Sequence, residues 1–320
     1  MRQAKLWRYA IPMESGVLLR DRRLTQREGL LLLLQENRRQ GWGEIAPLPG
    51  FSSETLAQAQ QACLAWIADW LTGRSPAESA LPSAAFGISC ACAELDGVLP
   101  NAASWQSAPL CYGDPDALLL QLQAQATPCA KMKVGLYEAA RDGMQVSLLL
   151  DALPQLRLRL DANRSWTPEK ARQFVRWLTP QQRVRIAFIE EPCRTPEESL
   201  RFAADCNVRI AWDETLREPG FTLRTQPGVA AVVIKPTLTG SIARVRQLIA
   251  DARQLGLEAV VSSALESSLG LTQLARLACW LTPQSTPGLD TLSLMRQQLV
   301  RRWPGCDRPL QEQAQWTQIY

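Results

Sequence analysis

Short apolar runs alternate with helical patterns from about residue 109 to residue 290. The runs lie near residues 109–112, 130–134, 156–161, 186–190, 209–213, 230–235, 258–262 and 287–290. Each run has the length of a buried strand, and the stretches between them carry apolar residues at helical spacing. Eight strands that alternate with helices predict a (β/α)8 barrel.

Helix starts can be read directly from several of the intervening stretches. Side chains able to cap a first turn precede four of them: Asp114, Thr167, Thr195 and Ser241. Proline follows Thr167 and Thr195 at the first helical position, and Glu198 adds the acid of a capping box. These signals support the alternation of strands and helices.

The first hundred residues have a different pattern. We expect antiparallel strands over 3–13, 17–24 and 29–36, a turn-rich segment over 41–52, and helices over 53–73 and 82–96. The fold class predicted is therefore α/β, a TIM-type barrel with an N-terminal α+β capping domain. The capping domain would span residues 1–100, with 295–320 returning to it, and the barrel would span 101–294.

Charged residues stand at the ends of five of the apolar runs. They are Lys133, Asp161, Glu190, Asp213 and Lys235. Charge placed repeatedly at strand ends is costly unless it is paired or used. In a barrel of this kind the carboxyl ends of the strands build the active site. Three acids on successive strands, flanked by lysines, suggest a divalent cation between two amines.

Side-chain alternation indicates that some of these charges converge. In the second run Lys131 and Lys133 share one face, and in the third run Arg159 and Asp161 do. The alternate positions are Ala, Met, Val or Leu, which suit packing against helices. The charged faces must then point into the barrel.

Composition restricts the chemistry further. The chain has 320 residues, nine cysteines and no histidine. The absence of histidine excludes a Ser-His-Asp or Cys-His nucleophile and His-ligated zinc. Acid–base chemistry must come from Lys, Asp, Glu, Tyr or Cys, whereas an all-oxygen Mg²⁺ site remains open.

The remaining features argue against several partners. The formal charge of +4 is small and the arginines are scattered, so nucleic-acid binding has no support. No apolar run approaches the roughly 20 residues of a membrane span, and no signal peptide is recognisable. Nine cysteines without a CxxC pair suit a reducing compartment. We therefore expect a cytoplasmic enzyme with no membrane or nucleic-acid partner.

The strings that contain these charges resemble the enolase superfamily and, within it, the muconate-lactonizing subgroup. They are KMKVG, LDANRSW, IEEP, AWDE, IKPTLTG and SSALESSLG, with RDRRL and GWGEIAPLPGFS in the first domain. The resemblance covers almost the whole chain. It implies that Asp161, Glu190 and Asp213 bind Mg²⁺, or Mn²⁺ in its place. It also implies that Lys133 removes a proton next to a carboxylate and that Lys235 lies across the substrate ring.

The resemblance extends to residues around this centre. Lys131 would orient and polarise Lys133. Substrate contacts are expected from Ser262, Ser263 and Gly288, and also from Arg159 and Asn163 on and after the strand of Asp161. A mobile lid over residues 16–23 would include Gly16, Arg20 and Arg22.

The activity implied by the resemblance is a dehydration in menaquinone biosynthesis. The substrate would be 2-succinyl-6-hydroxy-2,4-cyclohexadiene-1-carboxylate, and the metal would stabilise an enediolate. One lysine acting first as base and then as acid implies syn elimination. The resemblance also implies a monomeric protein that acts on a small-molecule carboxylate.

Other readings remain alternatives at this point. Dipeptide epimerases share the barrel, the metal ligands and the lysine pair, but their eighth strand usually carries Asp-x-Asp, where this chain has Gly288-Leu289-Asp290. N-acylamino acid racemases and muconate cycloisomerases are not excluded by residues alone, whereas the mandelate racemase subgroup needs a histidine. A non-catalytic metal-binding barrel would be expected to lack one of the lysines.

Overall fold

Two units make up the chain in the computed structural model, which describes residues 1–14, 18–19, 22–111, 115–125 and 128–320. Unit 1 comprises Met1–Trp105, Ile234–Leu248 and Val261–Tyr320, and unit 2 comprises Gln106–Val233 and Ile249–Val260. The domain boundaries expected from the sequence differ from these units and stay a prediction.

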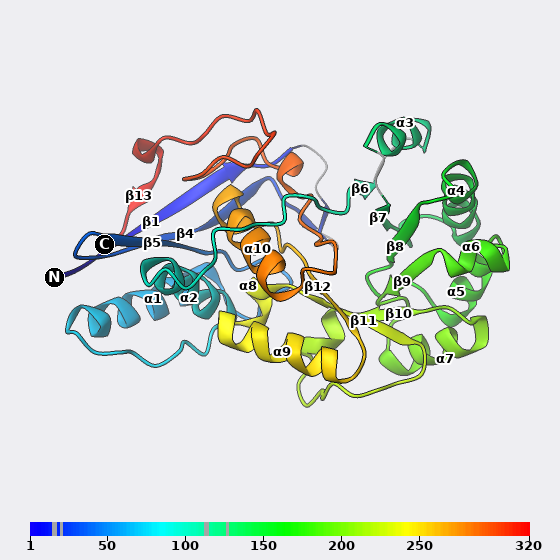
Figure 1. Cartoon of the computed structure of the whole chain (residues 1–320), viewed down its shortest axis with the longest axis horizontal. Helices are drawn as coiled ribbons and strands as arrows, with labels where there is room; N and C mark the ends of the chain where they lie inside the picture. Colours follow the sequence, from blue (N-terminus) through cyan, green and yellow to red (C-terminus); the bar gives the residue numbers. More distant parts are fainter. Residues whose placement is uncertain (15–17, 20–21, 112–114, 126–127) are drawn as a thin grey trace. The chain divides into compact units, whose positions relative to one another are not determined.

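Unit 1 is built on an antiparallel sheet with strand order β13-β1-β4-β5 (Figure 1). Its strands are β1 (Arg2–Pro12), β4 (Gln26–Glu36), β5 (Arg39–Ile45) and β13 (Thr317–Gln318). The described residues of the segment predicted as one strand over 17–24 form two short strands, β2 (Leu18–Leu19) and β3 (Arg22–Arg23), which pair with each other.

Helices cover one face of this sheet. Helix α1 (Leu56–Leu71) and helix α2 (Pro82–Leu95) share a buried core with alternate leucines of β4. Tryptophans from β1, β5 and the segment before β13 contact one another, with the ring centroids of Trp7 5.7 Å from Trp42 and 5.8 Å from Trp316. Unit 1 also contains α8 (Pro236–Thr239), α10 (Ser268–Leu281) and the 3-10 turns η2 (Leu292–Leu294) and η3 (Gln313–Gln315).

Strand β5 was missed, because its glycines resemble a turn. Helix α2 approaches β5 so closely that a Cβ atom on Gly43 would lie 1.9 Å from the carbonyl oxygen of Gly87. A Cβ on Gly41 would lie 2.0 Å from the carbonyl oxygen of Ala91. The glycines therefore serve helix–sheet contact within a strand, and the turn expected at the start of 41–52 is wrong.

Unit 2 contains a seven-stranded curled sheet with the order β12-β11-β10-β9-β8-β7-β6 (Figure 1). The strands are β6 (Leu110–Cys111), β7 (Cys129–Lys133), β8 (Arg157–Asp161), β9 (Ile186–Glu190), β10 (Ile210–Trp212), β11 (Val229–Ile234) and β12 (Glu258–Val261). The last residues of β11 and β12 fall in unit 1. Seven of the eight predicted runs are thus confirmed as strands, in the order that successive βα units produce.

The eighth predicted run, near 287–290, is not a strand. It makes a single parallel bridge, between Gly288 and Ser262. The residue before Gly288 is Pro287, which has no amide hydrogen to donate to a ladder, and a turn follows at Asp290.

Helices alternate with the strands of unit 2 and bury one face of the sheet. They are α3 (Pro115–Gln125), α4 (Ala139–Ala152), α5 (Pro168–Val175), α6 (Pro180–Val184), α7 (Pro196–Cys206) and α9 (Ile242–Gln254), the last of which begins in unit 1. Met132, Leu158 and Leu160 belong to the core cluster beneath these helices. The predicted helix-facing side of the second and third runs is therefore confirmed.

The predicted caps are present where the structure describes them. Thr167 accepts a hydrogen bond from the amide of Lys170 at 3.3 Å, and Thr195 accepts one from Glu198 at 3.2 Å. Ser241 likewise accepts from the amide of Arg244 at 3.3 Å. Helix α7 lacks the reciprocal side-chain bond of a capping box, so that part of the expectation is wrong. Asp114 lies outside the described residues.

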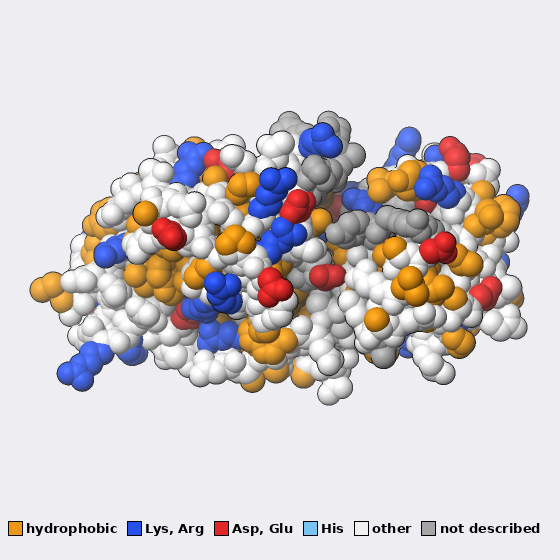
Figure 2. All heavy atoms as spheres, turned by 90° about the horizontal axis from the view of Figure 1, so that it is seen from above, with side chains coloured by type: hydrophobic (Ala, Val, Ile, Leu, Met, Phe, Trp, Pro, Cys, Tyr) orange, Lys and Arg blue, Asp and Glu red, His pale blue; other side chains and the backbone are white. Residues whose placement is uncertain are grey.

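Surface features add little to the predictions about partners. In the face shown in Figure 2, Lys and Arg side chains are interspersed with acidic and apolar ones. Among the helices that the structure describes, none is both long and apolar enough to cross a bilayer.

The close approach of α2 to β5 leads to a stability prediction. We expect Gly43→Ala to lower the free energy of unfolding by about 3 kcal/mol, because its methyl group would overlap the carbonyl of Gly87. Gly50→Ala is the control. It has positive φ (+80°) but nothing within 4 Å of its Cβ, so a loss of about 1 kcal/mol is expected. Urea unfolding measures both, and equal losses would contradict the packing explanation.

Candidate active site

The carboxyl ends of β7, β8 and β9 bring one lysine and two acids together in unit 2. The ladder places Lys133 opposite Asp161 and Asp161 opposite Glu190. The ammonium group of Lys131 lies 2.8 Å from Oδ2 of Asp161 and 2.7 Å from Oε2 of Glu190. Both acids are buried, with side chains 8% and 1% exposed. Three of the predicted site residues therefore meet in one ion-pair cluster.

The cluster keeps Lys131 charged. Burial alone would lower the pKa of Lys131, but Asp161 and Glu190 outweigh it and hold that pKa well above its usual value. A permanently charged ammonium group cannot accept a proton. Lys131 is therefore suited to neutralise the two acids, rather than to act as a base.

The third acid, Asp213, directly follows β10 and is fully buried. Its Oδ1 atom lies 2.5 Å from Nη1 of Arg217, within the 3-10 turn η1 (Glu214–Arg217). The backbone amide of Asp213 donates to Oε1 of Glu191 at 2.9 Å. Asp213 is thus held by its backbone on one side and by a guanidinium on the other.

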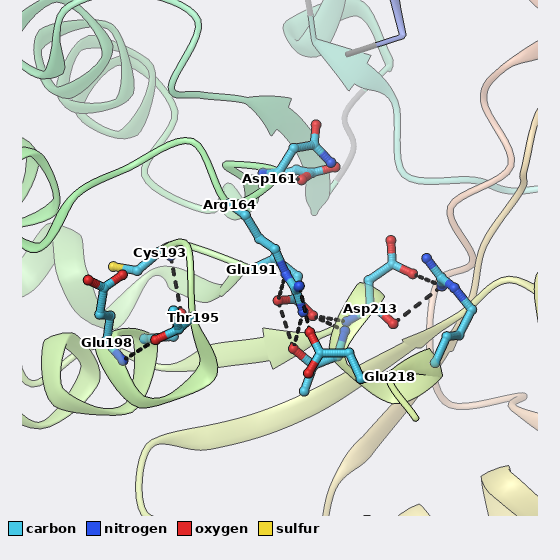
Figure 3. A network of polar contacts seen from close by, with 12 residues as sticks. Asp161, Arg164, Glu191, Cys193, Thr195, Glu198, Asp213 and Glu218 are labelled. Atoms are coloured by element: carbon cyan, nitrogen blue, oxygen red, sulfur yellow. Dashed lines mark hydrogen bonds and ion pairs between the residues drawn. The ribbon is translucent and has the colours of Figure 1, made fainter. Parts of the chain in front are cut away.

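A fourth buried acid, Glu191, joins β9 to its neighbours (Figure 3). Its Oε2 atom accepts a hydrogen bond from Nε of Arg164 at 2.9 Å and another from the hydroxyl of Thr215 at 2.9 Å. Arg164 also pairs with Glu218 at 2.6 Å. Sequence reasoning missed Glu191, Arg164 and Arg217. The doubled acid in IEEP was the available signal, since two adjacent acids at a strand end cannot share one face.

Arg159 and Asn163 make contacts of their own. Nη2 of Arg159 pairs with Glu258 of β12 at 2.8 Å, and its guanidinium lies 5.4 Å from the ring centroid of Phe188. The amide of Asn163 donates to Oδ1 of Asp161 at 3.1 Å, from a left-handed backbone (φ +43°). The substrate contacts expected of these two residues stay a prediction.

Other predicted site residues belong to unit 1. Lys235 follows β11 directly and occupies the N-cap position of α8. The hydroxyl of Ser262 donates to the carbonyl of Gly288 at 3.2 Å. Ser263 donates from its own hydroxyl to Glu266 at 2.8 Å. The serines and Gly288 are therefore neighbours within this unit, and their role towards substrate stays a prediction.

The predicted lid falls largely on residues that the structure does not describe. Gly16 and Arg20 lie outside the described residues. Arg22 is placed by its backbone alone, in β3.

The acids of unit 2 suit a hard divalent cation in their chemistry and in their backbone placement. Asp161, Glu190 and Asp213 are buried carboxylates at the ends of consecutive strands, and oxygen ligands are those that Mg²⁺ prefers. In this conformation Lys131 and Arg217 contact them instead. Across the described ranges, no group of three or more His, Cys, Asp and Glu side chains is close enough to hold an ion.

Comparisons with known proteins agree with this architecture. Residues 1–95 match the family described as MenC, N-terminal domain, and residues 117–304 match the enolase C-terminal domain-like family. An o-succinylbenzoate synthase from Enterobacter sp. is 62% identical over 97% of both chains. One from Escherichia coli is 58% identical over 98% of both.

Solved structures show the same fold. The o-succinylbenzoate synthase from Thermosynechococcus elongatus, complexed with Mg in its active site, has a TM-score of 0.72 and 28% identity, covering 90% of this chain and 92% of that one. The L-Ala-D/L-Glu epimerase from Bacillus subtilis has a TM-score of 0.73, with 18% identity over 92% and 90% of the two chains, and is similar in fold alone. Together with the near-full-length relatives, these matches show that the chain belongs to the o-succinylbenzoate synthase family of the enolase superfamily.

Proposed function

We propose that the chain catalyses the Mg²⁺-dependent syn dehydration of 2-succinyl-6-hydroxy-2,4-cyclohexadiene-1-carboxylate to o-succinylbenzoate, in menaquinone biosynthesis. The observation that carries the proposal is the alignment of Lys133, Asp161 and Glu190 across adjacent strand ends. It is supported by the identity of about 60% to o-succinylbenzoate synthases over nearly the full length.

Asp161, Glu190 and Asp213 are the proposed ligands of Mg²⁺, or of Mn²⁺, which accepts the same oxygen donors. When bound, the metal would supply positive charge to offset the negative charge that develops on the substrate carboxylate. The chain's part is to hold three acids buried at successive strand ends, with Lys131 keeping two of them from repelling each other.

Lys133 is the proposed acid–base group. It would take the proton from the ring carbon next to the carboxylate and return it to the departing hydroxyl, which leaves as water. Because one amine serves both steps, the proton and the hydroxyl leave from the same face. Lys235 would remain protonated and stabilise the anionic ring by a cation–π contact.

Further residues are proposed to hold the substrate. Ser262, Ser263 and Gly288 would bind its carboxylate and succinyl groups, and Arg159 and Asn163 would add contacts. The lid would include Gly16, Arg20 and Arg22. These roles rest on the family resemblance of the motifs that contain them.

We also propose a cytoplasmic monomer that acts on a small carboxylate, without a nucleic-acid or membrane partner. The nine cysteines form no disulfide in the structure, and such a pattern is usual in a reducing compartment.

The acid–base role leads to a mutational prediction. We expect Lys133→Ala to lower kcat by about 10³-fold or more, because the proton then has no acceptor. Mn²⁺ affinity, measured by electron paramagnetic resonance, should stay at the wild-type value. Lys5→Ala, at an exposed position of β1, is the control and should behave as wild type. Dehydration by Lys133→Ala at the wild-type rate would exclude this lysine from the reaction.

The metal requirement is tested by chelation. We expect EDTA followed by gel filtration to abolish dehydration, and added Mg²⁺ or Mn²⁺ to restore it. The reaction is followed by the ultraviolet absorbance of the cyclohexadiene substrate and of the aromatic product. Activity that survives complete removal of divalent ions would show that the three acids serve another purpose.

A further inference from the structure

The side chain of Glu191 is buried (1% exposed), and each of its two carboxylate oxygens accepts two hydrogen bonds. Oε1 accepts hydrogen bonds from the backbone amides of Asp213 at 2.9 Å and Thr215 at 2.8 Å. Oε2 accepts from Arg164 and from the hydroxyl of Thr215. A buried carboxylate with four donors is held in a single orientation.

The backbone of Glu191 ties three strand ends together. Its carbonyl oxygen accepts from the amide of Arg164 at 2.7 Å, beyond the end of β8. Its amide donates to the carbonyl of Ala211 in β10 at 3.1 Å. Glu191 has a left-handed backbone, with φ of +42°, which is unfavourable for a residue other than glycine. The surrounding bonds maintain this conformation directly after Glu190.

One of the two amides that donate to Glu191, that of Thr215, is an amide that an N-cap side chain normally satisfies. Asp213 is the N-cap residue of η1, and an Asp there usually turns its own carboxylate back onto the amides of the first turn. Asp213 makes no such cap bond. Glu191 instead satisfies the amide of Thr215 from the neighbouring strand. The carboxylate of Asp213 does not cap the amides of η1 and pairs with the guanidinium of Arg217, the last residue of the same turn.

We propose that Glu191 is a positioning residue: by capping η1 in place of Asp213, it keeps the carboxylate of Asp213 out of the cap and available to a cation. This inference rests on the proposed function, because the cation is the one assigned there to Asp161, Glu190 and Asp213. Arg164 holds Glu191 in this orientation through its hydrogen bond to Oε2.

The first test is metal affinity in the full chain. Glu191→Ala should weaken Mn²⁺ binding by about 10- to 100-fold, the usual effect of removing a group that orients a metal ligand. Without Glu191, Asp213 would turn back to cap Thr215. Glu191→Gln keeps an oxygen acceptor for the two amides, so it should recover part of the affinity. Electron paramagnetic resonance of free Mn²⁺ measures binding, and near-ultraviolet circular dichroism in EDTA checks the fold.

A matched control separates positioning from general loss of the ion-pair network. Glu218→Gln removes the other acid that pairs with Arg164, but leaves the bonds from Glu191 to Asp213 and Thr215 intact. We expect wild-type Mn²⁺ affinity from it. A loss as large as that of Glu191→Ala would overturn the proposal.

A double variant tests whether Glu191 acts through Asp213. Asp213→Asn alone and Glu191→Ala with Asp213→Asn should bind Mn²⁺ equally weakly, because the carboxylate that Glu191 directs is already gone. Additive losses would overturn the proposal, and so would wild-type affinity in Glu191→Ala. If Glu191→Ala does not fold, Glu191→Gln takes its place in the cycle, with the same criterion. If the wild-type chain binds no Mn²⁺, the proposed metal site itself is wrong and the inference fails with it.

Discussion

The arrangement of unit 2 depends on one electrostatic constraint: several carboxylates are buried close together at the ends of neighbouring strands. Two ionised acids cannot lie side by side in a low-dielectric interior unless positive charge is close to both. Lys131 provides that charge to Asp161 and Glu190, and its position is set by the ladder between β7 and β8. Arginines contact the next acids, Glu191 and Asp213. The register of the strands and the pairing of charges therefore determine each other.

Most of the parallel sheet could be predicted because each strand is a buried run bounded by polar residues. Burial and periodicity are local properties, so seven runs were placed to within one or two residues. Strand β5 could not be predicted in this way, since Gly41 and Gly43 are explained only by the helix that packs on them. The run at 287–290 failed for the opposite reason. Only Pro287 and Leu289 of this segment are apolar and buried, and Pro287 and the turn at Asp290 prevent a ladder.

The residues of the candidate site also fall into those that strand periodicity predicts and those that it does not. Strand parity placed Lys131 and Asp161 on the inward face of the sheet, because the period of a strand puts alternate side chains on one face. Glu190 was expected beside them only from its position at the end of a strand. Strand parity could not predict the role of Glu191, because its carboxylate accepts hydrogen bonds from backbone amides at the end of a different strand. Arg217 belongs to the same class, because only the turn of η1 brings it back to Asp213. Contacts between side chains and distant backbone leave no periodic trace in a sequence.

The chain's last residues complete the sheet that its first residues begin. Strand β13 pairs with β1, and the amide and carbonyl of Leu6 exchange hydrogen bonds with Ile319 and Tyr320. During synthesis on the ribosome, β1 emerges long before β13, so this edge of β1 stays open until β13 has been made. Completion of the N-terminal sheet therefore waits for a segment far along the chain, and exposed edges of this kind are where chaperones and misassembly compete.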